Sequence, residues 1–202
     1  MEDSYQIIAR EATAEIKVKG SRFIGETCIV DSVEEAIQRL EAIRKREYNA
    51  THHCYAWLVG LGTEQQFKYS DDGEPSGTAG KPIYDVVAGS GAVNLLCVVT
   101  RYYGGTKLGT GGLVRAYSEA ARVVMTKSGI ETRFLTDRLL FKIDFSLYDR
   151  WQKIMHGFEA AVVNSEFTDS VSLEVSIRQS RTQRLLDAFT ELTSGKGHVE
   201  KL

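Results

Sequence analysis

Two glycine-rich runs hold most of the residues in this 202-residue chain whose types and spacing could do chemistry. Residues 69–82 read YSDDGEPSGTAGKP, and residues 98–113 read VVTRYYGGTKLGTGGL. More than half of the 18 glycines, and both prolines, lie between Gly73 and Gly112. Because a single turn needs far fewer glycines, this clustering predicts two backbone-rich loops that shape one surface site.

The first run carries an acidic loop with Asp71, Asp72 and Glu74. Three carboxylates so close together could bind Mg²⁺, act as a general base, or contact a basic partner. Asp-Asp-Gly is also ordinary turn chemistry, so a solvated turn stays open as an alternative. The alternating oxygen ligands and the distal Glu of a calcium loop are missing, and we assign no metal.

The second run places a glycine loop, residues 104–112, directly before a helical pattern. Backbone amides at a helix N-terminus, together with the helix dipole, attract anions. The loop is not a nucleotide P-loop, because Thr110 and Gly111 stand where Lys and Ser or Thr are required. A tight strand-to-helix connection is the structural alternative. The predicted anion-binding residues are Lys81, Gly109, Thr110, Gly111 and Gly112.

Two adjacent tyrosines, Tyr102 and Tyr103, follow Arg101 at the end of a buried strand pattern. Neighbouring side chains of a strand point to opposite faces, so one ring is available to stack on a base or to anchor an interface, with a half-buried structural tyrosine as the alternative. Nearby lysine and arginine side chains would contact phosphates. The predicted nucleic-acid or partner surface comprises Arg101, Tyr102, Tyr103, Gly104, Gly105, Lys107 and Arg115.

No assembled catalytic set is visible in the sequence. His52 and Cys54 would share one face of a strand, but they supply only two metal ligands, and no CxxC or HxxxH partner follows. His53, beside a buried strand, is more typical of a structural hydrogen-bonding residue. We therefore expect no catalytic residue, metal or cofactor, and the sequence favours a protein that is not an enzyme.

Composition limits the location and the partners. The net charge of −2 lacks the basic surplus of most nucleic-acid-binding proteins, so any such surface must be a local patch. The acidic N-terminus does not resemble a targeting peptide, and no apolar run is long enough to span a bilayer. An odd number of cysteines in apolar surroundings, Cys28, Cys54 and Cys97, indicates the reducing cytoplasm. We expect a cytoplasmic protein without membrane contact or DNA specificity.

The first part of the chain alternates strand and helix patterns. Ser32 and Glu35 form a capping box that predicts a helix over residues 33–46. Pro82 suits the first turn of a short helix with Ile83, Val86 and Val87 inward. Strands are expected over residues 14–18, 23–30, 53–60, 66–69 and 95–100. A second long helix should bury Leu113, Val114, Tyr117, Ala120, Ala121, Val124 and Met125.

A domain boundary is expected near residues 128–129, where this second helix ends. Beyond it, residues 139–147 alternate as a strand, and Asp149 could cap the following helix. A hairpin turns at residues 168–170. Ser180 and Gln183 form another capping-box pattern, with Gly195 as the helix stop and a last strand over residues 198–202. The order β-α-β-β-α-β predicts a ferredoxin-like sandwich.

Four motifs resemble the IMPACT family, in its bacterial branch. They are SRFIG at 21–25, HHCYAW at 52–57, SDDGEPSGTAGKP at 70–82 and RYYGGTKLGTGGLVRAY at 101–117. They stand in the family's order and spacing. The resemblance is weaker over the C-terminal part, where bacterial members carry an additional small domain.

The resemblance implies an α+β protein of two domains. The N-terminal domain, residues 1–130, would have the left-handed βαβ fold of the second domain of a small-subunit ribosomal protein. The C-terminal domain, residues 131–202, would be similar to domain V of elongation factor G, which agrees with the ferredoxin-like order above. Eukaryotic members regulate translation by competing for the activator of a kinase. For this chain the resemblance implies a translation- or ribosome-linked role and no established catalytic activity.

Three hypotheses follow from these observations. The first is a non-enzymatic regulator of translation that binds RNA or a ribosome-associated surface through Arg101, Tyr102, Tyr103, Lys107 and Arg115. The second is an enzyme or sensor that binds a phosphorylated small molecule at residues 104–112, with a metal held by the acidic loop. The third is a protein–protein interaction module that uses the same loops.

Overall fold

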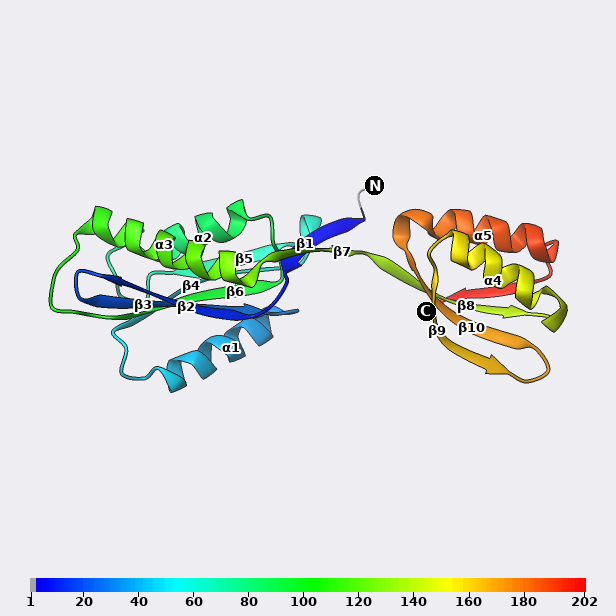
Figure 1. Ribbon diagram of the computed structural model, residues 1–202, viewed down its shortest axis with the longest axis horizontal. Coiled ribbons are helices and arrows are strands. Elements are labelled where there is room, and N and C mark those ends of the chain that lie inside the picture. Colours follow the sequence, from blue (N-terminus) through cyan, green and yellow to red (C-terminus); the bar gives the residue numbers. More distant parts are fainter. Residues whose placement is uncertain (1–2) are drawn as a thin grey trace. The chain divides into compact units, whose positions relative to one another are not determined.

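A computed structural model describes residues 3–202 of the chain. Contacts divide these residues into two compact units, one formed by Tyr5–Arg133 and one formed by Phe134–Leu202 with Asp3 and Ser4 (Figure 1). None of the helices in the described part of the chain combines the length and the apolar character needed to cross a membrane.

The first unit is built on an antiparallel five-stranded sheet with the order β2-β3-β6-β4-β5. Strands β3 and β4 both pair antiparallel with β6, so they run parallel to each other, one on either side of it. Helix α1 makes the crossover between them, which produces the expected βαβ element (Figure 1). The strands are β2 (Ala12–Val18), β3 (Ser21–Ile29), β4 (His52–Val59), β5 (Gln66–Ser70) and β6 (Leu95–Tyr102).

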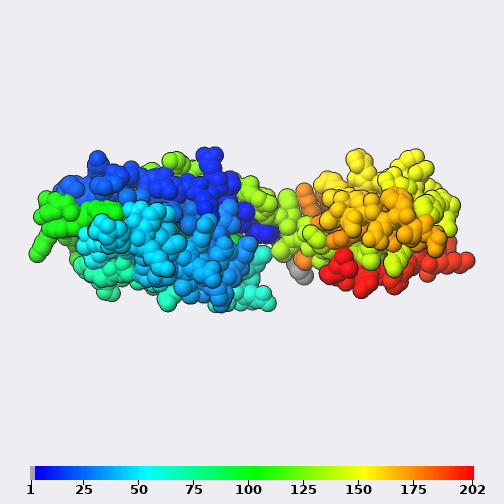
Figure 2. Space-filling view, turned by 90° about the horizontal axis from the view of Figure 1, so that it is seen from below, coloured from blue at the N-terminus to red at the C-terminus, as the bar shows by residue number. Residues whose placement is uncertain are grey.

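Helices cover both faces of this sheet. Helices α2 (Gly80–Gly89) and α3 (Thr110–Ser128) lie over one face, and α1 (Val33–Arg46) covers the other, which faces the viewer in Figure 2. The interior strand β4 is buried on both sides: Ala56 packs toward α2 and α3, and Trp57 toward α1. Its continuous apolar sequence follows from this double burial.

The local patterns of this unit are largely confirmed. The amide of Glu35 donates to Ser32 Oγ at 3.1 Å, and α1 begins and ends where the sequence predicts. The apolar stripe predicted for α3 is also confirmed, except at Val114, which is 37% exposed. A short 3-10 turn, η1 (Gly62–Glu64), precedes β5.

Strands β1 (Ser4–Ile8) and β7 (Ile130–Phe134) pair with each other, and neither was predicted. Their residues do not alternate between buried and exposed positions, so no pattern of period two marks them in the sequence.

The second unit is a four-stranded antiparallel sheet with the order β11-β8-β10-β9. Helices α4 (Tyr148–Gly157) and α5 (Gln179–Thr193) cover one face, and β9 and β10 (orange in Figure 2) are uncovered on the other. Trp151, Phe141 and Phe189 form the aromatic centre of the core, with ring centroids 4.7–4.9 Å apart. This arrangement confirms the ferredoxin-like fold and the α+β class. The strands are β8 (Thr136–Ile143), β9 (Ala161–Phe167), β10 (Val171–Arg178) and β11 (His198–Lys201).

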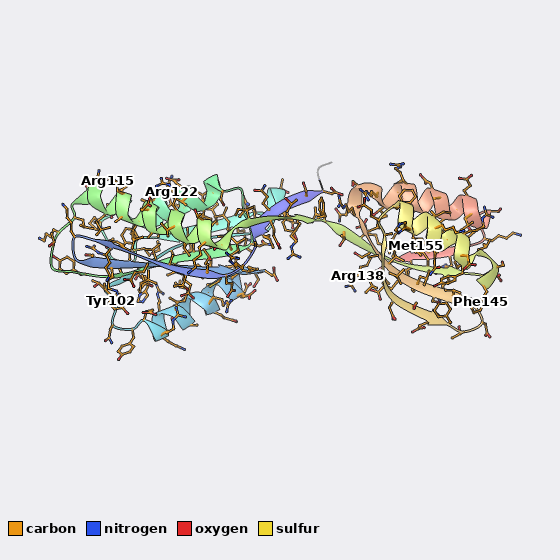
Figure 3. The ribbon with its side chains drawn as sticks, in the orientation of Figure 1. Tyr102, Arg115, Arg122, Arg138, Phe145 and Met155 are labelled. Carbon is orange, nitrogen blue, oxygen red and sulfur yellow. The ribbon has the colours of Figure 1, made fainter. Side chains whose placement is uncertain are left out.

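Three local predictions in this unit are wrong. Strand β8 ends at Ile143, because the Asp144 carboxylate accepts the amide of Ser146 at 2.8 Å and starts a 3-10 turn, η2 (Phe145–Leu147). Phe145 is consequently 49% exposed at that turn (Figure 3). Helix α4 begins at Tyr148, so Asp149 lies within its first turn and does not cap it. Helix α5 begins before Ser180, whose hydroxyl donates to Asp3 at 2.5 Å, so the second capping box does not form.

Candidate functional site

A buried ion pair joins the two glycine-rich runs. Arg101, at the end of β6, is 5% exposed, and Glu74, in the acidic loop, is 9% exposed. A guanidinium nitrogen of Arg101 donates to Glu74 Oε1 at 2.6 Å, and the hydroxyl of Tyr117 donates to the same oxygen at 2.7 Å. Strand β6, the acidic loop and helix α3 are therefore fixed to one another at a single carboxylate.

The same network reaches the glycine loop through Ser21. Ser21 Oγ accepts a second guanidinium nitrogen of Arg101 at 3.3 Å and the amide of Gly104 at 3.1 Å. A Cβ at position 104 would overlap the backbone of Gly20, so only glycine fits this approach of the two loops. We call Ser21, Glu74, Arg101 and Tyr117 the buried network. Each of its members comes from one of the recognised motifs, and its effect is to hold the start of the glycine loop in place.

The acidic loop is held by protein donors. Asp71 accepts backbone amides from Gly77, Ala79 and Gly80 at 2.8–2.9 Å, at the start of α2. Burial opposes the charged form, but these amides outweigh it and hold the pKa of Asp71 below its ordinary value. Asp72 accepts the amide of His53 at 2.6 Å and a guanidinium nitrogen of Arg44 at 2.8 Å.

No metal centre forms from these carboxylates. Across residues 3–202, no group of three or more His, Cys, Asp or Glu side chains is placed to hold a metal ion. Each of the three carboxylates accepts hydrogen bonds from different protein groups: Asp71 from backbone amides, Asp72 from His53 and Arg44, and Glu74 from Arg101 and Tyr117. The acidic loop therefore does not bring its three carboxylates together as one ligand set.

Cys54 and His52 do not form a nucleophile and base. The Cys54 thiol lies within hydrogen-bonding distance of the Asp71 carbonyl, at 3.0 Å, and His52 Nδ1 lies 2.8 Å from the Asp72 carbonyl oxygen. Burial raises the pKa of the Cys54 thiol far above its ordinary range. A thiol held in this protonated form is a poor nucleophile.

The structure separates the Arg-Tyr-Tyr run into three environments. The expectation of a surface cation at Arg101 is wrong, because its guanidinium is buried against Glu74. Tyr102 is half-buried on the α1 side of the sheet, where its hydroxyl donates to Glu47 at 2.8 Å (Figure 3). Tyr103 is 46% exposed, and the Arg101 guanidinium lies 5.4 Å from its ring centre. Of the two rings, Tyr103 is the one available for stacking.

The glycine loop itself is open to solvent. Gly105, Lys107 and Gly109 are exposed, and within residues 3–202 the backbone amides of residues 105–109 donate to no protein acceptor. Helix α3 follows with Gly109 at φ +70° in place of a capping side chain. Its first amides, at residues 110–112, have no helical partners either. This end of the unit therefore presents a row of unused backbone donors.

A groove of about 700 Å³ lies beside the loop, against the first turns of α3. Arg115 lines it, as predicted for the surface, and Arg115 and Arg122 lie along α3 in Figure 3. The lining of the groove contains three cations and one carboxylate, Glu119, which is a local excess of two positive charges (3 − 1). Lys81 is placed differently, in the first turn of α2, where it pairs with Asp85. The groove's cations are Lys19, Arg115 and Arg122.

Sequence reasoning missed Ser21 and Tyr117 in the network and Lys19 and Arg122 in the groove. Ser21 and Tyr117 lie at the ends of two recognised motifs, which was the available signal. Lys19 and Arg122 carried none, because only the folded unit brings them beside Arg115.

The fold and the site define a two-domain α+β protein with a buried ionic network beneath an exposed glycine loop. Residues 19–125 match the family model described as the Impact N-terminal domain, and residues 141–196 match a domain of unknown function, DUF1949. The chain belongs to the IMPACT family, as the four motifs predicted.

Relatives cover nearly the whole chain. The IMPACT family member YvyE of Bacillus subtilis is 32% identical over 98% of this chain and 91% of its own length. The IMPACT family member YigZ of Escherichia coli is 31% identical over 96% and 95%, in agreement with the bacterial branch. A crystal structure of a protein described as hypothetical superposes with a TM-score of 0.70 at 30% identity, covering 100% of this chain and 98% of that one.

Proposed function

We propose that this chain is a regulator linked to translation that binds single-stranded RNA at the exposed end of its N-terminal unit. The proposed contact surface, the loop surface, comprises Tyr103, Lys107, Arg115 and the amides of residues 105–112. The observation that carries the proposal is the fixed, solvent-open glycine loop between an exposed tyrosine and a basic groove.

The chemistry of the loop surface suits a ribonucleotide strand. Unused amides at a helix N-terminus and the cations of the groove would bind phosphates. The ring of Tyr103 would stack on a base, a contact worth about 1–3 kcal/mol per base in comparable sites. The buried network supports this role. It fixes the start of the glycine loop through Arg101 and Ser21, so Lys107 and Arg115 are not needed to neutralise Glu74.

The charge balance of the chain is compatible with this role. Net charge is −2, yet acids near the site are paired: Glu74 with Arg101, Asp72 with Arg44, and Glu119 of the groove with Arg122. The local basic surplus lies where the amides are free. The link to translation rests on membership of the IMPACT family, whose eukaryotic members regulate translation.

Removing Lys107 and Arg115 together tests the proposal. We expect Lys107→Ala/Arg115→Ala to weaken binding of a labelled single-stranded RNA by about tenfold at moderate salt, because two phosphate contacts are lost. The slope of log affinity against log salt should fall by about 1.4, since each charge contributes about 0.7 for a single strand. Fluorescence anisotropy across a salt series measures both quantities.

The matched control is Lys45→Ala/Lys68→Ala, which removes the same charge from exposed positions elsewhere in the unit. It should leave affinity and slope near the wild-type values. An unchanged slope in the Lys107→Ala/Arg115→Ala variant, or an equal loss in the control, would remove the loop surface from the proposal.

A further inference from the structure

A second concave site lies in the C-terminal unit, far in sequence from the loop surface. A cavity of about 980 Å³ opens between helices α4 and α5. Its lining includes the half-buried side chains of Ile154, Phe158 and Leu192. Four cations line its walls, two from each helix: Arg150, Lys153, Arg181 and Arg184. We call this cavity the α4–α5 groove.

The groove carries a positive excess that the protein does not neutralise. Its lining contains four cations and two carboxylates, Glu159 and Glu191, which leaves two net positive charges (4 − 2). Glu159 pairs with Arg181 at 2.9 Å. Among residues 3–202, no carboxylate lies within ion-pairing distance of Arg150, Lys153 or Arg184. Cations that face one another across a cavity repel, so an anion between them is stabilised.

Part of the site is already ordered. Arg181, in the lining of the groove, donates to the Phe158 carbonyl at 3.0 Å, which restrains its guanidinium. The guanidinium of Arg184 lies 5.7 Å from the centre of the Phe158 ring. An arginine held this way loses less side-chain entropy on binding, and its planar donors suit phosphate oxygens.

The carboxylates restrict the length of the ligand. Strand pairing makes β8 parallel to β9 and β10 parallel to β11, so the helix that joins each pair runs back antiparallel to its strands. Because β8 and β10 are themselves antiparallel, α4 and α5 run antiparallel to each other. Glu159 therefore lies at one end of the groove, after α4, and Glu191 lies at the other, in the last turn of α5. A polyanion that continued beyond the groove would pass a carboxylate at either end, whereas a compact anion would not.

We propose that the α4–α5 groove binds a small oligophosphate of about the size of a nucleoside triphosphate. The cavity volume lies within the range of small-molecule sites, roughly 300–1,000 Å³. Arginines from both walls hold the phosphates, and the Phe158 ring offers an apolar face to the rest of the ligand. The inference is independent of RNA binding at the loop surface, because it concerns a different unit and a different ligand.

Calorimetric titration of the full chain with tripolyphosphate and with ATP tests this site. Both ligands should bind the wild type, and Arg150→Gln/Arg184→Gln should weaken both by about tenfold or more, because one cation is lost from each wall. The control Arg138→Gln/Lys142→Gln removes the same charge from exposed positions on β8 (Arg138 in Figure 3) and should stay within about twofold of the wild type.

Three results would overturn the proposal. The first is no binding of either ligand by the wild type at about 1 mM, the weak end of specific binding. The second is an equal loss in the control, which would show general charge attraction. The third is displacement of tripolyphosphate by a single-stranded RNA that binds the groove more tightly, which would show that the carboxylates do not limit ligand length.

Discussion

Glu74→Ala should lower the free energy of unfolding of the N-terminal unit by about 3–5 kcal/mol, because it leaves the buried Arg101 guanidinium without its counter-charge. Both partners are almost fully buried, and the bond between them is 2.6 Å. Tyr117 loses the acceptor of its buried hydroxyl in the same variant. Urea unfolding followed by Trp57 fluorescence in a Trp151→Phe background measures the change in this unit.

A double variant separates the lost charge from lost packing. In Glu74→Leu/Arg101→Met no charge stays buried, and replacing such a pair with apolar side chains is often neutral or stabilising. We expect it to recover much of the stability lost in Glu74→Ala, apart from the cost of the unpaired Tyr117 hydroxyl, which both variants share. Its RNA affinity should nevertheless fall, because the side chain at position 101 then no longer donates to Ser21 Oγ beside the glycine loop. A loss below about 1 kcal/mol in Glu74→Ala would place the pair among ordinary surface ion pairs and contradict the network.

Gly104→Ala should disrupt the glycine loop and its RNA binding together. The new Cβ would overlap the backbone of Gly20 and Ser21, so one loop must move and the amide of Gly104 must leave Ser21 Oγ. Overpacking of this kind costs about 1–3 kcal/mol, and we expect the upper end because the obstacle is backbone. RNA affinity should fall by about tenfold, because the shifted loop no longer presents its amides to the RNA phosphates in hydrogen-bonding geometry.

Gly111→Ala is the matched control. It lies in the same loop-to-helix segment, but its Cβ would approach only the end of the Arg115 side chain, at 3.8 Å. Alanine is also the better helix former in the first turn of α3. The free energy of unfolding should therefore be unchanged or raised. Equal behaviour of the two variants would show that the approach of Gly104 to Gly20 has no role in the site.

The sequence predicted the features that depend on near neighbours. Helix α1 was placed correctly because its cap, Ser32 and Glu35, and its apolar stripe lie within a few residues of one another. The order of strands and helices in the C-terminal unit followed from periodicity for the same reason. Phe145 was misplaced because one short polar side chain, Asp144, ended a strand whose alternation continued beyond it.

The candidate site depended on contacts between distant residues, and these were not predictable. Glu74 lies 27 positions from Arg101 and 43 from Tyr117, and Ser21 lies 83 from Gly104. Pattern alone marked Arg101 as one more cation of a basic loop. Only the fold shows that Arg101 is buried in an ion pair with Glu74, which leaves Lys107 and Arg115 as the exposed cations of the run.

The most direct test of the account is to locate the RNA contact itself. A single-stranded RNA containing 4-thiouridine is irradiated with the full chain, and the crosslinked tryptic peptides are identified by mass spectrometry. Cleavage after Arg101 and Lys107 isolates residues 102–107, which contain Tyr103. We predict that the crosslink lies in this peptide and is lost in Tyr103→Ala. Crosslinks confined to other parts of the chain, or their absence, would contradict RNA binding at the loop surface.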